Sequence, residues 1–130
     1  MDIRWQQRYS NFQKALSQLE RFVQNDELNE MEEQGLIKAF EYTFELAWKT
    51  LQDFLKEKGY VGIVGPRPVI EQSFQDGYIS DGTGWLRMLT ARNLSSHTYD
   101  EQTAKEIIGD IKSEFIIFLK DLKIRLAKEL

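Results

Sequence analysis

The sequence contains no cysteine and only one histidine, His97. Without cysteine the chain cannot form disulfides, thiolate zinc sites or a thiol nucleophile. With a single imidazole it cannot build a histidine cluster, so any metal site would need mainly oxygen ligands. We therefore expect a protein of a reducing compartment that uses neither a metal nor any other cofactor.

Long hydrophobic runs are also lacking. The longest strongly apolar stretch, residues 115–119, is far shorter than the roughly 20 residues that cross a bilayer. The start of the chain carries charges at Asp2, Arg4 and Arg8 and has no apolar segment typical of a signal peptide. We expect no membrane association and a cytoplasmic location.

The sequence has no excess of positive charge. Its 17 Lys and Arg residues are outnumbered by 21 Asp and Glu residues, which gives a net charge of −4. The surface as a whole is therefore not expected to adhere to nucleic acid through charge alone. Binding of RNA or a nucleotide would need a local basic patch.

The composition is that of a globular protein, with 42% hydrophobic and 29% charged residues. A length of 130 residues supports one domain with a core and is too short for two. We expect residues 1–130 to form a single domain.

Three long stripes of apolar residues predict three long helices. Their intervals of three and four residues are those of a helix face, not of a strand. The first helix covers residues 3–24, the second follows an acidic run and stops at Gly59, and the last starts near Asp100 or through a cap at Thr98. The stripes are Trp5, Tyr9, Phe12, Leu16, Leu19 and Val23; then Leu36, Phe40, Phe44, Ala47 or Trp48, Leu51, and Phe54 or Leu55; then Ile108, Ile111, Phe115, Phe118, Leu122 and Leu126.

The second stripe is wider than one partner helix needs, because Ile37, Tyr42 and Leu46 lie on its neighbouring faces. A helix of this kind is either central to a bundle or also part of a dimer interface.

The middle of the chain predicts a loop and two shorter helices. The glycines of residues 60–67 lack the Gly-Lys-Ser/Thr ending of a phosphate-binding loop, and a strand there would have nothing to pair with. Pro68 suits the first turn of a short helix, and Asp81 suits the cap of another. The apolar residues of these helices are Ile70 and Phe74 in one, and Trp85, Met88 and Leu89 in the other. The pattern is therefore that of an all-α bundle with long first, second and last helices and two shorter ones between.

Polar chemistry concentrates in residues 91–100, where Arg92, Asn93, Ser96, His97 and Tyr99 share a helix junction. Positions five apart on an ideal helix differ by about 140°, so Arg92 and His97 converge on one ligand only if the helix loosens around residues 95–96. Such a pair suits phosphodiesters, because a guanidinium neutralises a phosphate oxygen and an imidazole moves a proton of a ribose hydroxyl. The alternative is a capping or packing histidine beside a surface arginine.

The motif and its surroundings resemble the HEPN superfamily. The Arg-Asn-x-x-x-His-x-Tyr run is preceded by Gly-Trp-Leu-Arg-Met-Leu at residues 84–89 and by Pro-Val-Ile at residues 68–70 with Phe74, and the similarity extends to the helix of Trp48. Within the superfamily the chain is similar to the nucleotidyltransferase substrate-binding proteins. The resemblance implies an all-α antiparallel bundle of four to five helices that forms a homodimer and works beside a separately encoded minimal nucleotidyltransferase.

For the site, the resemblance implies a metal-independent ribonuclease with Arg92 and His97 as the catalytic pair and Asn93 as the polar residue after the arginine. It also implies a toxin–antitoxin pair in which the transferase silences its partner by adding nucleotides to Tyr99. Arg92, Ser96 and Tyr99 would contact the RNA or nucleotide.

Two functional classes remain open. A ribonuclease needs both a base and an acid, and a two-fold dimer would place two copies of Arg92 and His97 in one cleft. The name of the branch implies the other class, a non-catalytic subunit that binds a nucleotide or other substrate for the transferase.

Overall fold

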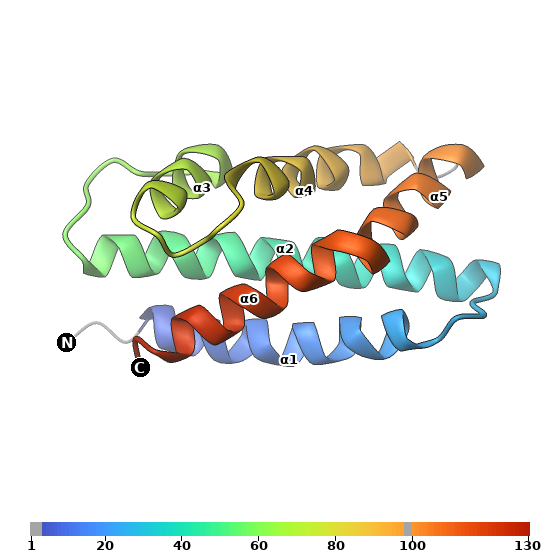
Figure 1. The fold of residues 1–130 in the computed structure, drawn as a ribbon, viewed down its shortest axis with the longest axis horizontal. Helices are drawn as coiled ribbons and strands as arrows, with labels where there is room; N and C mark the ends of the chain where they lie inside the picture. The colour runs from blue at the N-terminus through green and yellow to red at the C-terminus, as the bar shows by residue number, and fades with distance from the viewer. Residues whose placement is uncertain (1–3, 98–99) are drawn as a thin grey trace.

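The computed structural model describes residues 4–97 and 100–130, and over these ranges every regular element is helical (Figure 1). The elements are α1 (Arg4–Gln24), α2 (Glu30–Glu57), α3 (Pro66–Gln75), α4 (Gly82–Leu94), a 3-10 turn η1 (Ser95–His97), α5 (Glu101–Asp110), a π-helical turn η2 (Ile111–Phe115) and α6 (Ile116–Ala127). The prediction of an all-α bundle is confirmed.

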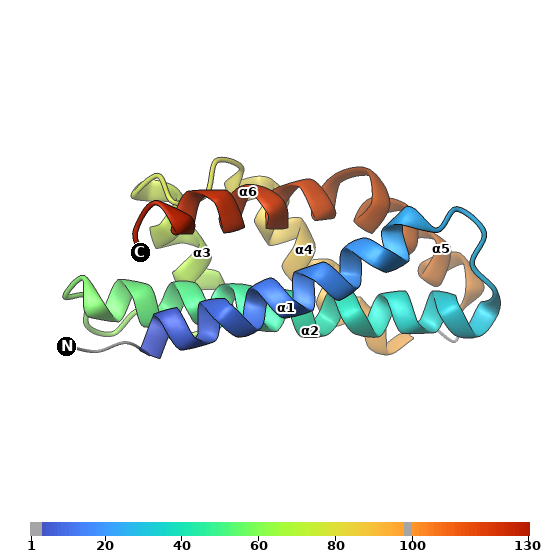
Figure 2. The same cartoon turned by 90° about the horizontal axis from the view of Figure 1, so that it is seen from below.

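Helices α1 and α2 pack as an antiparallel pair joined by a short connection (Figures 1 and 2). The start of α2 is fixed by a capping box, in which Asn29 Oδ1 accepts from Glu32 N at 2.8 Å and Glu32 Oε1 accepts from Asn29 N at 3.0 Å. Glu30, Glu32 and Glu33 occupy the first turn, where the helix dipole favours negative charge. The acidic run therefore has the structural role expected from the sequence.

Helix α2 is the central element, because α1, α3, α4, α5 and α6 all contact it. Its phenylalanines tie distant parts of the chain together: Phe40 stacks on Phe115 with ring centroids 5.4 Å apart, and Phe44 lies 6.2 Å from Trp85. The breadth of the α2 stripe thus follows from its central position. Of the extra apolar residues on its sides, Ile37 is buried and Leu46 is partly buried, while Tyr42 is 59% exposed.

Helix α3 confirms that Pro68 lies in the first turn of a short helix, but the predicted loop of residues 60–67 ends earlier, at Gly65. The helix begins at Pro66, which follows Gly65 at φ 91°, so the chain enters the helix two residues before Pro68. Of the two apolar residues that mark this helix in the sequence, Ile70 is buried together with Val69, whereas Phe74 is 51% exposed. The Phe74 ring instead covers Gly82, where an added Cβ would lie 3.0 Å from it.

The long C-terminal helix is not regular. The N–H of Ile116 bonds to Ile111 O, five residues back, within the π turn η2. A π turn inserts an extra residue and rotates the following helix face. Beyond it the buried residues are Ile116, Leu119, Leu122 and Leu126, while Phe118 is only partly buried. The prediction of one uniform stripe through Phe118 is therefore wrong at this residue.

Different helix ends meet at the two ends of the bundle. The start of α1, the end of α2 and the end of α6 lie at one end, and the junction between α4 and α5 lies towards the other (Figures 1 and 2). Among the described residues, no helix combines the length and the apolar character needed to cross a membrane.

Candidate functional site

Helix α4 carries the first half of the sequence-predicted site. Asp81 caps it, since its Oδ1 accepts from Gly84 N at 2.8 Å, as predicted. Trp85, Met88 and Ala91 on the helix are buried against the core. With Ala91 turned inward, the next residues reach the surface at the end of the helix.

Arg92 is held by a residue from α2. Its Nε forms an ion pair with Glu45 Oε1 at 2.7 Å, and its Nη1 donates to Asn93 Oδ1 at 3.4 Å. Lys49 Nζ lies 3.7 Å from the other oxygen of Glu45. The three charged side chains of this cluster, Arg92, Glu45 and Lys49, leave one positive charge at the end of α4.

The α-helix ends at the place where the sequence suggests a break. It tightens into the 3-10 turn η1, and the Ser95 hydroxyl donates to Arg92 O at 2.7 Å. Ser95 is buried, whereas Asn93, Ser96 and His97 are exposed. A 3-10 turn advances about 120° per residue instead of 100°, so the tightening alone does not rotate His97 towards Arg92.

The other half of the junction is fixed by Asp100. Its backbone N–H donates to His97 O at 3.2 Å, and its carboxylate caps α5 by accepting from Gln102 N at 3.1 Å and from Thr103 Oγ1 at 2.9 Å. The predicted helix start at Asp100 is confirmed. The alternative cap at Thr98 and the predicted modification site at Tyr99 lie outside the described residues.

Two polar atoms on the same face of α2 are buried without a hydrogen bond from any described residue. They are Glu41 Oε1 and Trp48 Nε1, four residues before Glu45 and three after it. Buried polar atoms normally have a partner. Both atoms are shielded from solvent, and Glu41 Oε1 lies 3.8 Å from Lys38 Nζ, so they belong to the packing of α2.

A second arginine of α4 has a different environment. Arg87 pairs with Glu114 and lies 3.8 Å from Asp110, while its guanidinium covers the Phe115 ring at 5.9 Å. These contacts tie α4 to the C-terminal helix. Arg87 is 46% exposed and Arg92 is 42% exposed, so the two arginines form a matched pair for comparison.

Sequence analysis missed Glu45. No spacing relates it to Arg92, and the only hint was a carboxylate between Phe44 and Leu46 on an otherwise apolar stripe. Among residues 4–97 and 100–130, no three side chains of the metal-binding types gather closely enough to hold an ion.

Comparison with solved structures shows the same bundle elsewhere. A protein from Thermus thermophilus matches with a TM-score of 0.82 and 31% identity, over 88% of this chain and 98% of that one. A Haemophilus influenzae protein, whose structure is described as the fold of a substrate binding domain of a nucleotidyltransferase, matches with a TM-score of 0.82 and 24% identity, over 92% and 98% of the two chains.

A curated relative from Haemophilus influenzae, named "Probable ribonuclease HepT", is 29% identical over 87 residues, which cover 64% of this chain and 59% of that protein. The match thus spans about three fifths of the relative's length. Residues 7–128 match the family described as "Nucleotidyltransferase substrate binding protein like". Because this match covers nearly the whole chain and the fold agrees, the chain belongs to the nucleotidyltransferase substrate binding protein like family.

Proposed function

We propose that this chain is the partner subunit of a separately encoded minimal nucleotidyltransferase and that its homodimer is a metal-independent ribonuclease. The observation that carries the proposal is the Arg92–Glu45 pair at 2.7 Å, which holds a half-exposed guanidinium at the same junction as the exposed His97. The family description supports the transferase partner, and the relative named as a ribonuclease supports the activity.

In this mechanism, Glu45 pairs with Nε of Arg92, Asn93 accepts from Nη1, and Nη2 is left to a phosphate oxygen of RNA. His97 of one protomer takes the proton of the ribose 2′-hydroxyl, whose oxygen attacks the adjacent phosphorus. The bond to the 5′-oxygen breaks, and that oxygen takes a proton from the second His97 of the dimer. The products are a 2′,3′-cyclic phosphate and a 5′-hydroxyl. Asn93 and Ser96 would hold the substrate beside Arg92.

Regulation in this proposal acts on Tyr99. The transferase adds nucleotides to its phenol, and the added phosphates compete with RNA for Arg92. The pair then behaves as a toxin and its antitoxin.

One gel tests the ribonuclease. Protein purified without the transferase is incubated with single-stranded RNA or with DNA of the same sequence, with and without EDTA. Wild type should cleave only RNA, since the reaction needs the 2′-hydroxyl. His97→Ala should abolish cleavage, and Arg92→Ala should lower it by roughly 10² to 10³. Arg87→Ala, which removes an equally exposed arginine from the same helix, should leave the rate within about twofold.

The second candidate is a non-catalytic subunit that binds a nucleotide or other substrate for the transferase. The family description favours it, as does the similarity to the Haemophilus structure described as a substrate binding domain. If wild type leaves RNA intact under all these conditions but binds the transferase, this candidate replaces the ribonuclease.

A further inference from the structure

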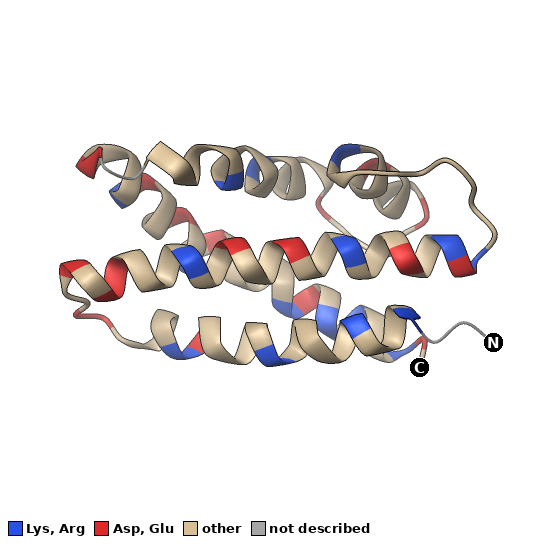
Figure 3. Cartoon of the chain, turned by 180° about the vertical axis from the view of Figure 1, so that it is seen from behind, with Lys and Arg blue, Asp and Glu red and all other residues tan. Residues whose placement is uncertain are grey.

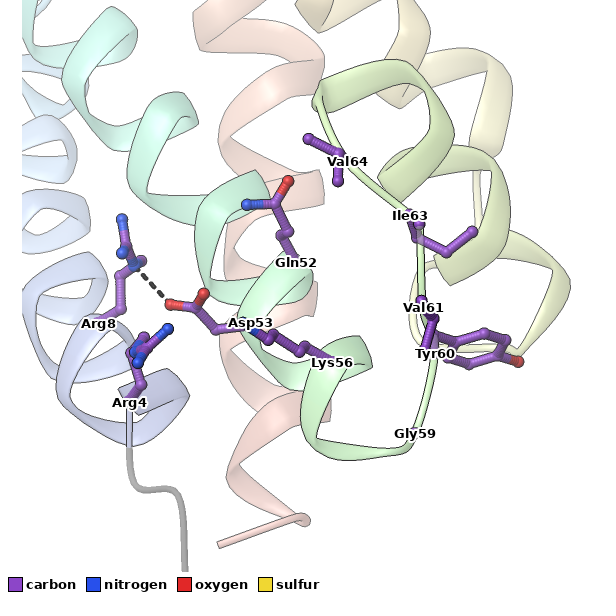
Figure 4. Close-up of a pocket in the computed structure, with 11 residues that line it drawn as sticks. Arg4, Arg8, Gln52, Asp53, Lys56, Gly59, Tyr60, Val61, Ile63 and Val64 are labelled. Atoms are coloured by element: carbon purple, nitrogen blue, oxygen red, sulfur yellow. Dashed lines mark hydrogen bonds and ion pairs between the residues drawn. The ribbon is translucent and has the colours of Figure 1, made fainter.

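A separate pocket lies at the other end of the bundle, where α1 and the end of α2 face the loop of residues 58–65. Figure 4 shows Arg4 and Arg8 of α1 on one side, the loop on the other, and Gln52, Asp53 and Lys56 of α2 between them. Its volume is about 680 Å³, within the range of roughly 300 to 1,000 Å³ typical of small-molecule sites.

The pocket is basic although the chain is acidic. Three cationic side chains, Arg4, Arg8 and Lys56, and one carboxylate, Asp53, line it, which is a local charge of +2 in a chain of net charge −4. Figure 3 shows residues of both charge signs along the neighbouring length of α2.

The arginine is held in place. Arg8 Nε donates to Asp53 Oδ2 at 2.8 Å, and Asp53 is only 9% exposed. This bond uses Nε and leaves the two terminal nitrogens of Arg8 without a hydrogen bond to any described residue. A guanidinium fixed in this way presents two parallel donors, the geometry that matches a phosphate.

The opposite wall is a fixed loop. Gly59, Gly62 and Gly65 have φ of 104°, 83° and 91°, which side chains rarely adopt, so the loop's path depends on glycine. Gly65 N donates to Gln52 Oε1 at 2.9 Å. The Tyr60 hydroxyl donates to Asp76 Oδ2 at 2.6 Å, and this bond raises the pKa of the phenol.

The bond from Gly65 also orients Gln52. Because its Oε1 accepts that bond, its Nε2 is left to the pocket, where Figure 4 shows it on the side of Arg8. The loop in turn leaves Val61 and Val64 93% and 71% exposed beside the charged residues. Fixed anion donors facing an exposed apolar wall fit a ligand with a phosphate at one end and a flat, weakly polar group at the other.

We propose that this pocket binds a nucleoside phosphate, with the phosphate on Arg8 and Lys56 and the base against Val61 and Val64. This site is distinct from the Arg92 junction, which lies towards the other end of the bundle (Figure 1). The proposal goes beyond the ribonuclease and does not depend on it.

Isothermal titration of the full chain with ADP, adenosine and inorganic phosphate tests the site. ADP should bind saturably and at least tenfold more tightly than either fragment. Lys56→Glu should weaken ADP at least tenfold. The double variant Arg8→Met with Asp53→Leu should do the same, and it removes the guanidinium without leaving an unpaired buried carboxylate.

If the proposal holds, two control variants should bind ADP with an affinity within about twofold of wild type. Lys38→Glu makes the same charge change as Lys56→Glu at the other end of α2, and Arg92→Ala removes the arginine of the other site. No saturable ADP binding, or equal binding of phosphate alone, would overturn the proposal. Weakening of ADP binding by Lys38→Glu to the same extent as by Lys56→Glu would also overturn it, because it would show a general charge effect. Loss of ADP binding in Arg92→Ala would overturn it as well, because it would place the nucleotide at the junction. The titration measures ADP binding and not RNA cleavage. A negative result would therefore overturn the pocket proposal without bearing on the ribonuclease proposal, which the gel tests.

Discussion

Arg92 Nε and Glu45 Oε1 lie 2.7 Å apart, although the two residues come from helices α4 and α2 and are distant in the sequence. Arg92 is more exposed, at 42%, than Glu45, at 25%, so the carboxylate forms the inner side of the pair. The ion pair keeps the guanidinium beside the α2 carboxylate at the end of α4. On the proposed function, Glu45 is a positioning residue for Arg92.

Replacing Glu45 should therefore slow RNA cleavage without unfolding the protein. A partly exposed ion pair contributes up to about 1 kcal/mol, so Glu45→Gln should lower kcat by roughly fivefold. KM should change by less than about threefold if Arg92 acts mainly on the transition state. The matched control is Glu114→Gln. It removes the carboxylate partner of Arg87, the other arginine of α4, and should leave kcat at the wild-type value. Equal losses in both variants would assign Glu45 a purely structural role.

The homodimer is tested by sedimentation. At micromolar concentration the mass should be about twice the 15.3 kDa of the chain. Tyr42 is a large apolar side chain that α2 leaves 59% exposed, and Tyr42→Glu should shift the protein towards monomer because it places a charge in the interface. Ile124→Glu, at an equally exposed position on α6, should remain dimeric. A monomer that still cleaves RNA would contradict the shared cleft.

Nucleotide addition is expected at Tyr99. After co-expression with the neighbouring transferase, intact-mass analysis should show one or more added nucleotides, and Tyr99→Phe should show none. Tyr42→Phe, which alters another tyrosine at an exposed position, should keep the additions. If the added mass persists in Tyr99→Phe, the transferase modifies a different residue.

The buried phenol of Tyr9 makes a stability prediction that is independent of function. Its hydroxyl donates to Lys123 O at 2.6 Å and ties α1 to α6, so Tyr9→Phe should lower the free energy of unfolding by about 1 kcal/mol in urea denaturation. Thr43→Val, which removes a hydroxyl bonded within its own helix, is the comparison and should cost less.

The same residue predicts a pH dependence. Burial raises the pKa of Tyr9 above its ordinary value of 10.0 in the folded state. The unfolded chain therefore loses this proton first as pH rises, so the stability from Tyr9 is complete below about pH 10 and declines as pH passes through the folded pKa. In Tyr9→Phe the fall in Tm above pH 10 should be shallower than in wild type. Parallel Tm curves for the two proteins would show that Tyr9 does not set this dependence.

Local patterns in the sequence predicted where the helices lie, apart from the π turn that interrupts the last one. The stripe from Trp5 to Val23, the cap at Asp81 and the helix start at Asp100 all appear in the structure as predicted. Interactions within a helix and at its cap join residues three or four positions apart, so neighbouring residues suffice to indicate them. The motif residues from Arg92 to His97 could be selected for the same reason, since they are close in the chain.

Only the tertiary structure decided which distant side chains meet. Glu45 reaches Arg92, Asp53 reaches Arg8, and the π turn at Ile111–Phe115 brings Leu119 in place of Phe118 towards the core. Each of these depends on how whole helices pack, because the rotation and offset of one helix against another determine which residues on their surfaces come within contact distance. The spacing of residues along one helix carries no information about that offset, and the basic pocket between α1, α2 and the glycine loop follows from it as well.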